Sequence, residues 1–365
     1  MAYWNEEADE LPEDDLDSGE PGTAEKIERF RTVTGKGMEP LRIDKYLMNR
    51  VENITRNKIQ QIIDNEMVLV DGNPVKANFK VKGGMEIVMY ETRLPEYSEI
   101  KPEQMPLDII YEDEVLMVIN KPPNMVVHPG CGNYSGTLLN GLAWYLNPEQ
   151  DPEKTSALPR IGLVHRIDKD TSGLLLIAKT EDAMQKLAAQ FKAHTVHRRY
   201  TGLAWGDYKE DEGTITAHIG RNLRFRKKMD AFPDGSYGKH AITHYTVLER
   251  FLYVTLLEFR LETGRTHQIR VHNRLIGHPL FNDSTYGGDS IVKGTVYAKY
   301  KQFVDNCFKI LPRHALHARE LGFIHPVTGQ EMFFTSELPA DFKEVIEKWR
   351  RYTSSYKQLE GDEAY

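Results

Sequence analysis

HRIDKDTSG, at residues 165–173, runs directly into the apolar segment LLLI at residues 174–177. The pattern predicts a polar turn that enters a buried strand, and such a turn holds a side chain in a fixed direction and a partly desolvated setting. Asp168 in this turn is therefore our first candidate for a catalytic residue. An Asp followed by Thr-Ser-Gly is also typical of a turn cap, whose carboxylate binds backbone N–H groups.

Two later segments also combine polar side chains with a strand pattern, HRRYTGLAWG at residues 197–206 and LETGRTHQIRVH at residues 261–272. The first predicts a strand that contains Tyr200. Alternation in the second predicts that Arg265, His267 and Ile269 share one face of a strand, while Gln268, Arg270 and His272 share the other. His267 and His272 would then point to opposite faces, and no Cys or carboxylate accompanies them, so we expect no metal site.

The three segments, in this order, resemble the signature motifs of the RluA-type pseudouridine synthases, with Ile167 in place of the common Leu. The resemblance implies that Asp168 is the catalytic residue of uridine isomerisation in RNA and that Tyr200 lies in the active site. It also implies that Arg270 is the ion-pair partner of Asp168. In the family an Arg at the position of Arg166 occupies the space that a flipped base leaves; the alternative is an ion pair with Asp170.

Further matches to the family extend the resemblance over about residues 37 to 350. They are NKPPNMVVHP at 120–129, GHPL at 277–280, DSTYG at 283–287 and ALHA at 315–318. Arg265 and His267, within the third motif, join the residues expected to bind RNA. Asn282 stands where the family usually has Gly, and because Asn tolerates a positive φ we expect this turn to be preserved.

Residues 37 to 91 predict a small α+β unit. Ile43, Leu47 and Val51 have helical spacing, Thr55 is a candidate cap for a second helix, and short strands follow around turns at Asp71-Gly72 and at residues 83–84. The segment resembles an S4 RNA-binding domain. The resemblance implies that basic side chains of the two helices contact an RNA backbone, namely Arg42, Lys45, Arg56 and Lys58.

The predicted fold class is α+β: a pseudouridine synthase catalytic fold, with a mixed, mainly antiparallel sheet and flanking helices, preceded by the small S4 domain. We expect five segments. They are an acidic disordered tail at 1–36, the S4-like domain at 37–92, a linker at 93–106, the catalytic domain at 107–355 and a frayed end at 356–365.

Composition places the protein among soluble, cytoplasmic chains. The 365 residues include 40% hydrophobic and 28% charged side chains, without an apolar run long enough to span a bilayer. The first residues lack the features of a signal peptide. Cys131 and Cys307 are the two cysteines, which argues against a disulfide framework and for a reducing compartment.

The negative charge is concentrated at the N-terminus. Residues 1–20 contain nine acidic residues and no Lys or Arg, so that removing them changes the net charge from −7 to about +2. The tail either improves solubility or competes with phosphate for basic surfaces. A basic cluster is predicted to be either a plain surface loop or a loop that faces RNA: Arg221, Arg224, Arg226, Lys227 and Lys228.

The predicted function is isomerisation of specific uridines to pseudouridine in structured RNA, by base flipping followed by Asp-assisted cleavage of the glycosidic bond and rejoining at C5. Large-subunit ribosomal RNA is the expected substrate and transfer RNA the alternative. We expect a monomer without cofactor, bound nucleotide or membrane partner. Two other classes remain, a non-catalytic RNA-binding or ribosome-assembly protein and a glycoside or nucleoside hydrolase. Whether Asp168 acts as nucleophile or base is left open.

Overall fold

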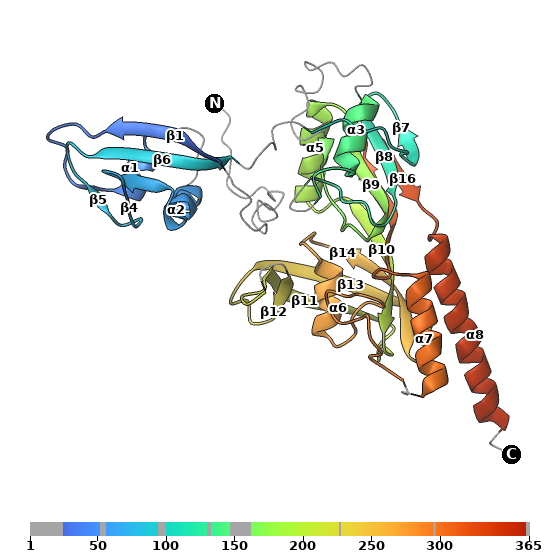
Figure 1. Ribbon diagram of the computed structural model, residues 1–365. Coiled ribbons are helices and arrows are strands. Elements are labelled where there is room, and N and C mark those ends of the chain that lie inside the picture. The colour runs from blue at the N-terminus through green and yellow to red at the C-terminus, as the bar shows by residue number, and fades with distance from the viewer. Residues whose placement is uncertain are drawn as a thin grey trace. The chain divides into compact units, whose positions relative to one another are not determined.

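The computed structural model describes residues 25–51, 56–93, 100–129, 133–146, 162–225, 228–294 and 297–362. The chain divides into a small unit within residues 19–99 and a large unit within residues 100–365 (Figure 1). The predicted cap Thr55 and most of the acidic tail lie outside the described residues.

The small unit packs two short helices against two small antiparallel sheets. The sheets have the strand orders β1-β6-β3-β4 and β2-β5. Side chains from both helices are buried against the strands, among them Ile43 and Leu47 at the predicted helical spacing. The elements are β1 (Glu25–Val33), β2 (Leu41–Arg42), α1 (Ile43–Met48), α2 (Arg56–Asp64), β3 (Val68–Val70), β4 (Asn73–Pro74), β5 (Lys80–Val81) and β6 (Glu86–Arg93).

The predicted disordered tail at 1–36 is too long. Glu25–Val33 form β1, which pairs antiparallel with β6 along its whole length. Arg31 accounts for part of this order, because its guanidinium binds Glu28 on the same strand and Glu86 on the neighbouring one. The strand mixes apolar and charged side chains, so its composition alone does not distinguish it from a disordered segment.

The large unit is built on a ten-stranded mixed sheet. Its order is β12-β11-β13-β14-β10-β15-β9-β8-β7, with β16 paired to β15. Among the described residues, β9 and β15 pair in parallel and the other strand pairs are antiparallel, which confirms the predicted mixed, mainly antiparallel sheet. Its strands are β7 (Ile109–Glu112), β8 (Leu116–Lys121), β9 (Ser172–Ala178), β10 (His197–Trp205), β11 (Glu212–Arg221), β12 (Met229–Phe232), β13 (Lys239–Arg250), β14 (Val254–Leu261), β15 (Leu316–Ile324) and β16 (Glu331–Thr335).

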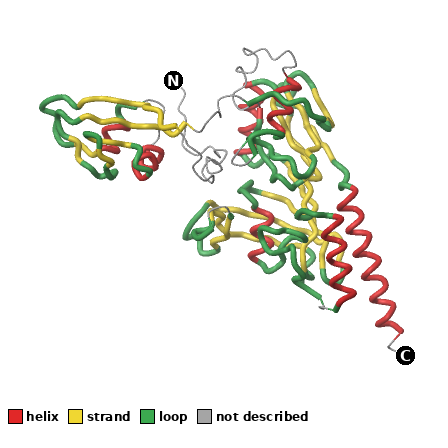
Figure 2. Tube along the Cα trace, viewed as in Figure 1, coloured by secondary structure: helices red, strands yellow, loops and turns green. Residues whose placement is uncertain are grey.

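Helices flank this sheet, as predicted. Helices α7 and α8 lie side by side (Figure 2). Trp349 of α8 is buried against Trp205 of β10. Thr180 caps its helix by accepting a hydrogen bond from the amide of Ala183, as expected. The helices are α3 (Leu138–Leu146), α5 (Glu181–Lys192), α6 (Gln268–Leu275), α7 (Ala298–Ile310) and α8 (Ala340–Asp362).

Three further expectations are wrong in detail. Residues 261–272 are not one strand, because β14 ends at Leu261 and α6 begins at Gln268. The C-terminus does not fray from residue 356, since α8 continues to Asp362. The predicted linker at 93–106 extends too far, because Ile100 packs against the core of the large unit and the carbonyl of Lys101 accepts a hydrogen bond from Asn140.

None of the helices among the described residues is long and apolar enough to cross a membrane.

Candidate active site

Asp168 lies in the turn that precedes β9, one of the central strands of the large sheet. The turn closes with a hydrogen bond from the amide of Thr171 to the carbonyl of Asp168, 3.2 Å long. Gly173 has φ +114°, and a Cβ placed there would lie 2.2 Å from the carbonyl oxygen of Ala318 on β15. Only glycine therefore allows the turn to enter the sheet so close to its parallel neighbour, which fixes where Asp168 stands.

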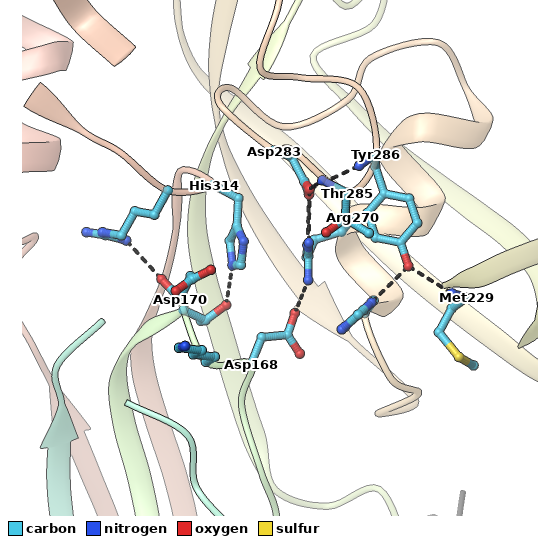
Figure 3. A network of polar contacts seen from close by, with 12 residues as sticks. Asp168, Asp170, Met229, Arg270, Asp283, Thr285, Tyr286 and His314 are labelled. Atoms are coloured by element: carbon cyan, nitrogen blue, oxygen red, sulfur yellow. Dashed lines mark hydrogen bonds and ion pairs between the residues drawn. The ribbon is translucent and has the colours of Figure 1, made fainter. Parts of the chain in front are cut away.

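Arg270, on α6, connects Asp168 to a second carboxylate (Figure 3). Its Nη1 donates to Oδ2 of Asp168 at 3.0 Å, while Nε and Nη2 donate to the two oxygens of Asp283 at 2.8 and 2.9 Å. Asp283 is fully buried and also accepts hydrogen bonds from the amides of Thr285 and Tyr286. The predicted ion pair between Arg270 and Asp168 is present, and Asp283 holds the guanidinium in place from the other side.

This arrangement does not fit the turn-cap interpretation of Asp168, and its catalytic role stays a prediction. Among the described residues, the hydrogen-bond partner of its carboxylate is a guanidinium and not an amide of its own turn. Its side chain is 19% exposed, whereas that of Arg270 is 6% exposed. The carboxylate is thus oriented by a tertiary contact and can still be reached, as an attacking group must be.

The electrostatics keep Asp168 ionised. Burial by itself would raise the pKa of Asp168, but the neighbouring His267 and the guanidinium of Arg270 outweigh burial and hold this pKa well below its usual range. Burial likewise acts to raise the pKa of Asp283, and the hydrogen bonds from Arg270 lower it. Both carboxylates therefore carry charge at neutral pH, and only Asp168 is placed to use it.

Tyr200 lies on β10, as expected, between β14 and β15. It is 7% exposed and belongs to the same apolar cluster as Ile167, the residue before Asp168. Burial and the nearby charge of Asp168 raise the pKa of Tyr200, although Arg198 acts in the opposite direction. The phenol is thus held in its protonated form beside an ionised carboxylate.

A second tyrosine, Tyr286, lies beside the start of α6 and contacts both His267 and Arg270. His267 precedes α6 with φ 55°, and its Nδ1 lies 2.8 Å from the hydroxyl of Tyr286. This hydroxyl accepts a hydrogen bond from the amide of Met229, and the Arg270 guanidinium lies 5.0 Å from the ring centroid of Tyr286. Burial lowers the pKa of His267. The attraction of Asp168 acts in the opposite direction and the charge of Arg270 adds to the lowering, so a neutral ring is favoured.

The structure places Arg166 and Arg265 at the edge of this group. Arg166 is exposed and close enough to influence the titration of His267. Arg265 is half-buried and donates from Nε to the carbonyl of His240. The alternative ion pair of Arg166 with Asp170 stays a prediction.

The predicted RNA-binding residues of the small unit belong to a separate surface. Arg42 makes two hydrogen bonds to the buried carboxylate of Asp44, whereas Lys45 is exposed on α1. Arg56 and Lys58 lie in the first turn of α2. Lys45 is therefore better placed than Arg42 to offer its charge to a ligand.

Sequence reasoning missed Asp283, Tyr286 and Lys121. The first two lie in DSTYG, and Lys121 lies in NKPPNMVVHP; both strings were matched to the family without a role for these residues. Their contribution depends on the fold, which brings loops from three parts of the chain to Asp168. Burial of a Lys or an Asp marks it as unusual, but this burial can be seen only in the folded structure.

The two histidines of the third motif do not share a site. His272 is fully buried, its Nδ1 lies 2.9 Å from the hydroxyl of Thr243, and burial lowers its pKa to about 4. The strand geometry used above against a metal site does not hold, because α6 is a helix. Within the described residues, no group of three or more His, Cys, Asp or Glu side chains could hold a metal ion.

Comparisons with known proteins give a family match for each of the two units. A family model described as RNA pseudouridylate synthase matches residues 115–274, and the S4 domain model matches residues 41–87. A Chlorobaculum parvum protein described as an uncharacterized RNA pseudouridine synthase is 46% identical over 317 residues, which covers 86% of this chain and 96% of the relative.

Ribosomal large subunit pseudouridine synthase D of Escherichia coli K12 is 38% identical, with 92% of this chain and 98% of the relative covered. Among solved structures, human RNA pseudouridylate synthase domain containing 4 is similar with a TM-score of 0.51 and 25% identity. That match covers 66% of this chain and 92% of the human one.

Proposed function

The chain belongs to the RNA pseudouridine synthase family, and from this membership and the geometry of its site we propose that it converts specific uridines of large-subunit ribosomal RNA to pseudouridine. The observation that carries the proposal is the ionised carboxylate of Asp168, held by Arg270 beside the protonated phenol of Tyr200. The relative from Escherichia coli carries the ribosomal large subunit in its name, which directs the choice of RNA.

The proposed reaction begins with base flipping, because a stacked uridine hides both its glycosidic bond and its C5 edge. Arg166, exposed next to the catalytic turn, takes the vacated space or a phosphate. Asp168 then assists cleavage of the bond between C1′ and N1, either by adding covalently or as a base. The uracil turns while it remains bound, and C5 joins C1′.

Loss of the C5 proton completes the isomerisation. Burial keeps the phenol of Tyr200 protonated, so its hydroxyl can accept this proton only while passing its own proton on. We assign the final acceptor role to the carboxylate of Asp168, which is free again once C5 has joined C1′, with Tyr200 as the relay. Tyr200 also offers a ring face on which the uracil can stack.

The small unit supports affinity in this proposal. An S4 domain that presents Lys45 to phosphates would position the enzyme without reading sequence, and we propose Arg56 and Lys58 as further contacts. Arg265 and His267 complete the set of proposed RNA contacts in the large unit. The proposed enzyme acts as a cytoplasmic monomer and needs no cofactor. Transfer RNA is the second candidate substrate, and an S4 domain is compatible with either.

A hydrolase would need a second carboxyl group that can donate a proton. The carboxylate nearest to the Arg270 guanidinium, apart from Asp168, is Asp283, and its low pKa and bidentate contact prevent that role. A non-catalytic RNA-binding protein would not require an ionised carboxylate that is both oriented and accessible. Neither alternative accounts for the group formed by Asp168, Arg270 and Tyr200.

The products test the proposal directly. Large-subunit ribosomal RNA transcribed in vitro with tritium at C5 of uracil would be incubated with the purified full chain. We expect tritium to be released to water while the nucleoside count stays constant, with pseudouridine found after digestion. Free uracil would indicate a hydrolase, and an unchanged transcript together with unchanged transfer RNA would contradict an isomerase.

A further inference from the structure

The three residues that follow Asp168 are each held by a side chain from a distant part of the large unit. Lys121 reaches the carbonyl of Lys169, Arg313 reaches the carbonyl of Asp170, and Nε2 of His314 lies 2.8 Å from the hydroxyl of Thr171. Two of the three contacts are made by cationic side chains to backbone carbonyls, which is an unusual use of buried charge.

Lys121 ends β8 and is fully buried. Its ammonium donates to the carbonyls of Pro122, Met125 and Lys169 at 2.8, 3.0 and 3.0 Å, so all three of its N–H bonds are used. Burial lowers the pKa of Lys121 to about 7, against the attraction of Asp168 and Asp170. A buried ammonium satisfied in this way ties the loop after β8 to the catalytic turn.

Arg313 approaches the same turn from the segment before β15. It is 6% exposed, and its Nε and Nη2 donate to the two oxygens of Asp341, in the first turn of α8, at 3.0 Å each. The remaining Nη1 donates to the carbonyl of Asp170 at 3.2 Å. The carboxylate of Asp341 thus fixes the plane of the guanidinium, and the guanidinium in turn holds the turn.

We propose that Lys121 and Arg313 are positioning residues for the isomerisation, which clamp the backbone immediately after Asp168 and so fix the direction of its carboxylate. Arg270 holds the carboxylate itself by one hydrogen bond to Oδ2, and the amide of Thr171 closes the turn onto the carbonyl of Asp168, but these two contacts leave the peptide planes of Lys169 and Asp170 free to rotate. Fixing the carbonyls of the two following residues removes that freedom. A displacement of about 1 Å at a reacting group can reduce a rate about a hundredfold.

The inference rests on the proposed function, because it concerns the direction of a group in that reaction. A purely structural role for Arg313, attaching α8 to the sheet, is the competing explanation. The two differ in what they leave intact. A structural role affects the unfolding temperature and the amount of folded protein, whereas a positioning role lowers the rate constant of folded enzyme that still binds RNA.

The test uses single-turnover tritium release from the C5-labelled ribosomal transcript, with RNA affinity measured separately by filter binding. Arg313→Gln should lower the rate constant about 10- to 100-fold while the Kd for RNA changes less than about twofold. Arg313→Lys, which keeps one donor for the carbonyl of Asp170, should recover part of the loss. Asp341→Asn should lower the rate in the same direction and be non-additive with Arg313→Gln.

Arg250 provides a matched control in the same unit. Its guanidinium also joins carboxylates to a carbonyl, donating to Asp207 and Asp211 and to the carbonyl of Tyr208, but it holds no part of the catalytic turn. Arg250→Gln should leave the rate constant unchanged. Lys121→Met, which keeps the length of the side chain and removes its donors, tests the other half of the clamp.

The outcomes are distinct. If folded Arg313→Gln and Lys121→Met bind RNA and react at the wild-type rate, the clamp is rejected. The clamp is also rejected if the loss of activity in each variant equals its loss of folded protein. That is the behaviour expected of the control Arg250→Gln. If Arg313→Gln does not fold, the milder Asp341→Asn decides. If the wild type releases no tritium from ribosomal or transfer RNA, the proposed function fails and not the clamp alone.

Discussion

Asp168, Arg270 and Asp283 form a line of alternating charge in which the two outer groups have different tasks. Asp283 is fully buried, and its carboxylate accepts hydrogen bonds from a guanidinium and two amides. It therefore orients Arg270 and takes no part in the reaction itself. Asp168 receives one hydrogen bond from Arg270 and keeps exposed surface. The guanidinium therefore acts as a spacer that sets both the position and the protonation state of Asp168.

Removing the guanidinium should move the acid limit of the reaction. Because burial acts to raise the pKa of Asp168 and both His267 and Arg270 oppose it, Arg270→Gln should raise this pKa. The reactive carboxylate is then lost as the pH falls through the raised value. We expect the single-turnover rate of the wild type to be level down to about pH 5 and that of Arg270→Gln to begin its fall at a higher pH than that of the wild type.

Arg270→Lys is the comparison for this experiment, since it keeps the charge but cannot bind Asp283 with two parallel donors. It should retain the wild-type acid limit at a reduced rate. Parallel pH profiles for the wild type and Arg270→Gln would show that Arg270 does not control the ionisation of Asp168.

Tyr200→Phe separates the ring of Tyr200 from its hydroxyl. The ring should still stack on the uracil, so RNA affinity should change little, but the relay for the C5 proton is lost. We expect tritium release to slow by at least about a hundredfold. A wild-type rate for Tyr200→Phe would limit Tyr200 to stacking, and the measurement is the same single-turnover assay.

The resemblance to the family made Asp168, Tyr200 and Arg270 candidate site residues from sequence, but it gave no role to Asp283 or to the clamp residues. Arg313 and Asp341 lie far from residue 168 in sequence, and nothing in their neighbours indicates that they converge on one turn. Such contacts depend on the order of strands in the sheet. That order is not encoded in any local pattern.

Among the elements, the turn at Asn282 was predicted correctly from the tolerance of Asn for positive φ. Asn282 has φ 57°, and its side-chain amide donates to the carbonyls of Phe308 and Leu311 at the end of α7. Asn therefore does more than replace the usual Gly. It fastens the loop that carries Asp283 to a helix.

This gives a prediction for two substitutions. Asn282→Ala loses both hydrogen bonds and places a Cβ at positive φ without local compensation, so we expect the free energy of unfolding to fall by about 2 to 4 kcal/mol. Asn282→Gly loses the same hydrogen bonds, but glycine adopts a positive φ without strain. Its free energy of unfolding should therefore fall by about 1 to 2 kcal/mol less than that of the Ala variant. Denaturation followed by tryptophan fluorescence would measure both. Equal losses would mean that backbone conformation contributes nothing here.

The segment at 261–272 was predicted as a strand because polar and apolar residues alternate in it. The structure instead ends β14 at Leu261, turns at residues 266–267 and begins α6. Residues 268–273 are all buried, so the first six residues of α6 show no alternation of buried and exposed positions that could distinguish a helix from a strand. His267, at positive φ before the helix, is a further feature that propensity does not anticipate.

For the molecule as a whole, the sequence predicted two folded units and their order along the chain, and both family models match. The boundaries were less accurate, because β1 extends the small unit toward the N-terminus and α8 extends the large one toward the C-terminus. Both extensions contain many charged residues. Pairing with β6, rather than composition, stabilises β1.

The proposed division of labour between the units predicts different effects for substitutions in each. Lys45→Gln, in the small unit, should weaken RNA binding by a few-fold and reduce the slope of log Kd against log salt by about one unit, since one phosphate contact is lost. The single-turnover rate at saturating enzyme should not change. Arg42→Gln should have the smaller effect on the slope, because its charge is already paired with Asp44. A larger slope change for Arg42→Gln would contradict this assignment.

The most direct test of the account maps pseudouridine by carbodiimide adduct formation and primer extension. The RNA would come from cells that lack this protein and carry either the wild type or Asp168→Asn. We predict that at least one site in large-subunit ribosomal RNA loses its modification in the deletion strain. The wild type should restore the site, and Asp168→Asn, although folded and bound to RNA, should not. Restoration by Asp168→Asn, or unchanged modification of every ribosomal and transfer RNA in the deletion strain, would contradict the account.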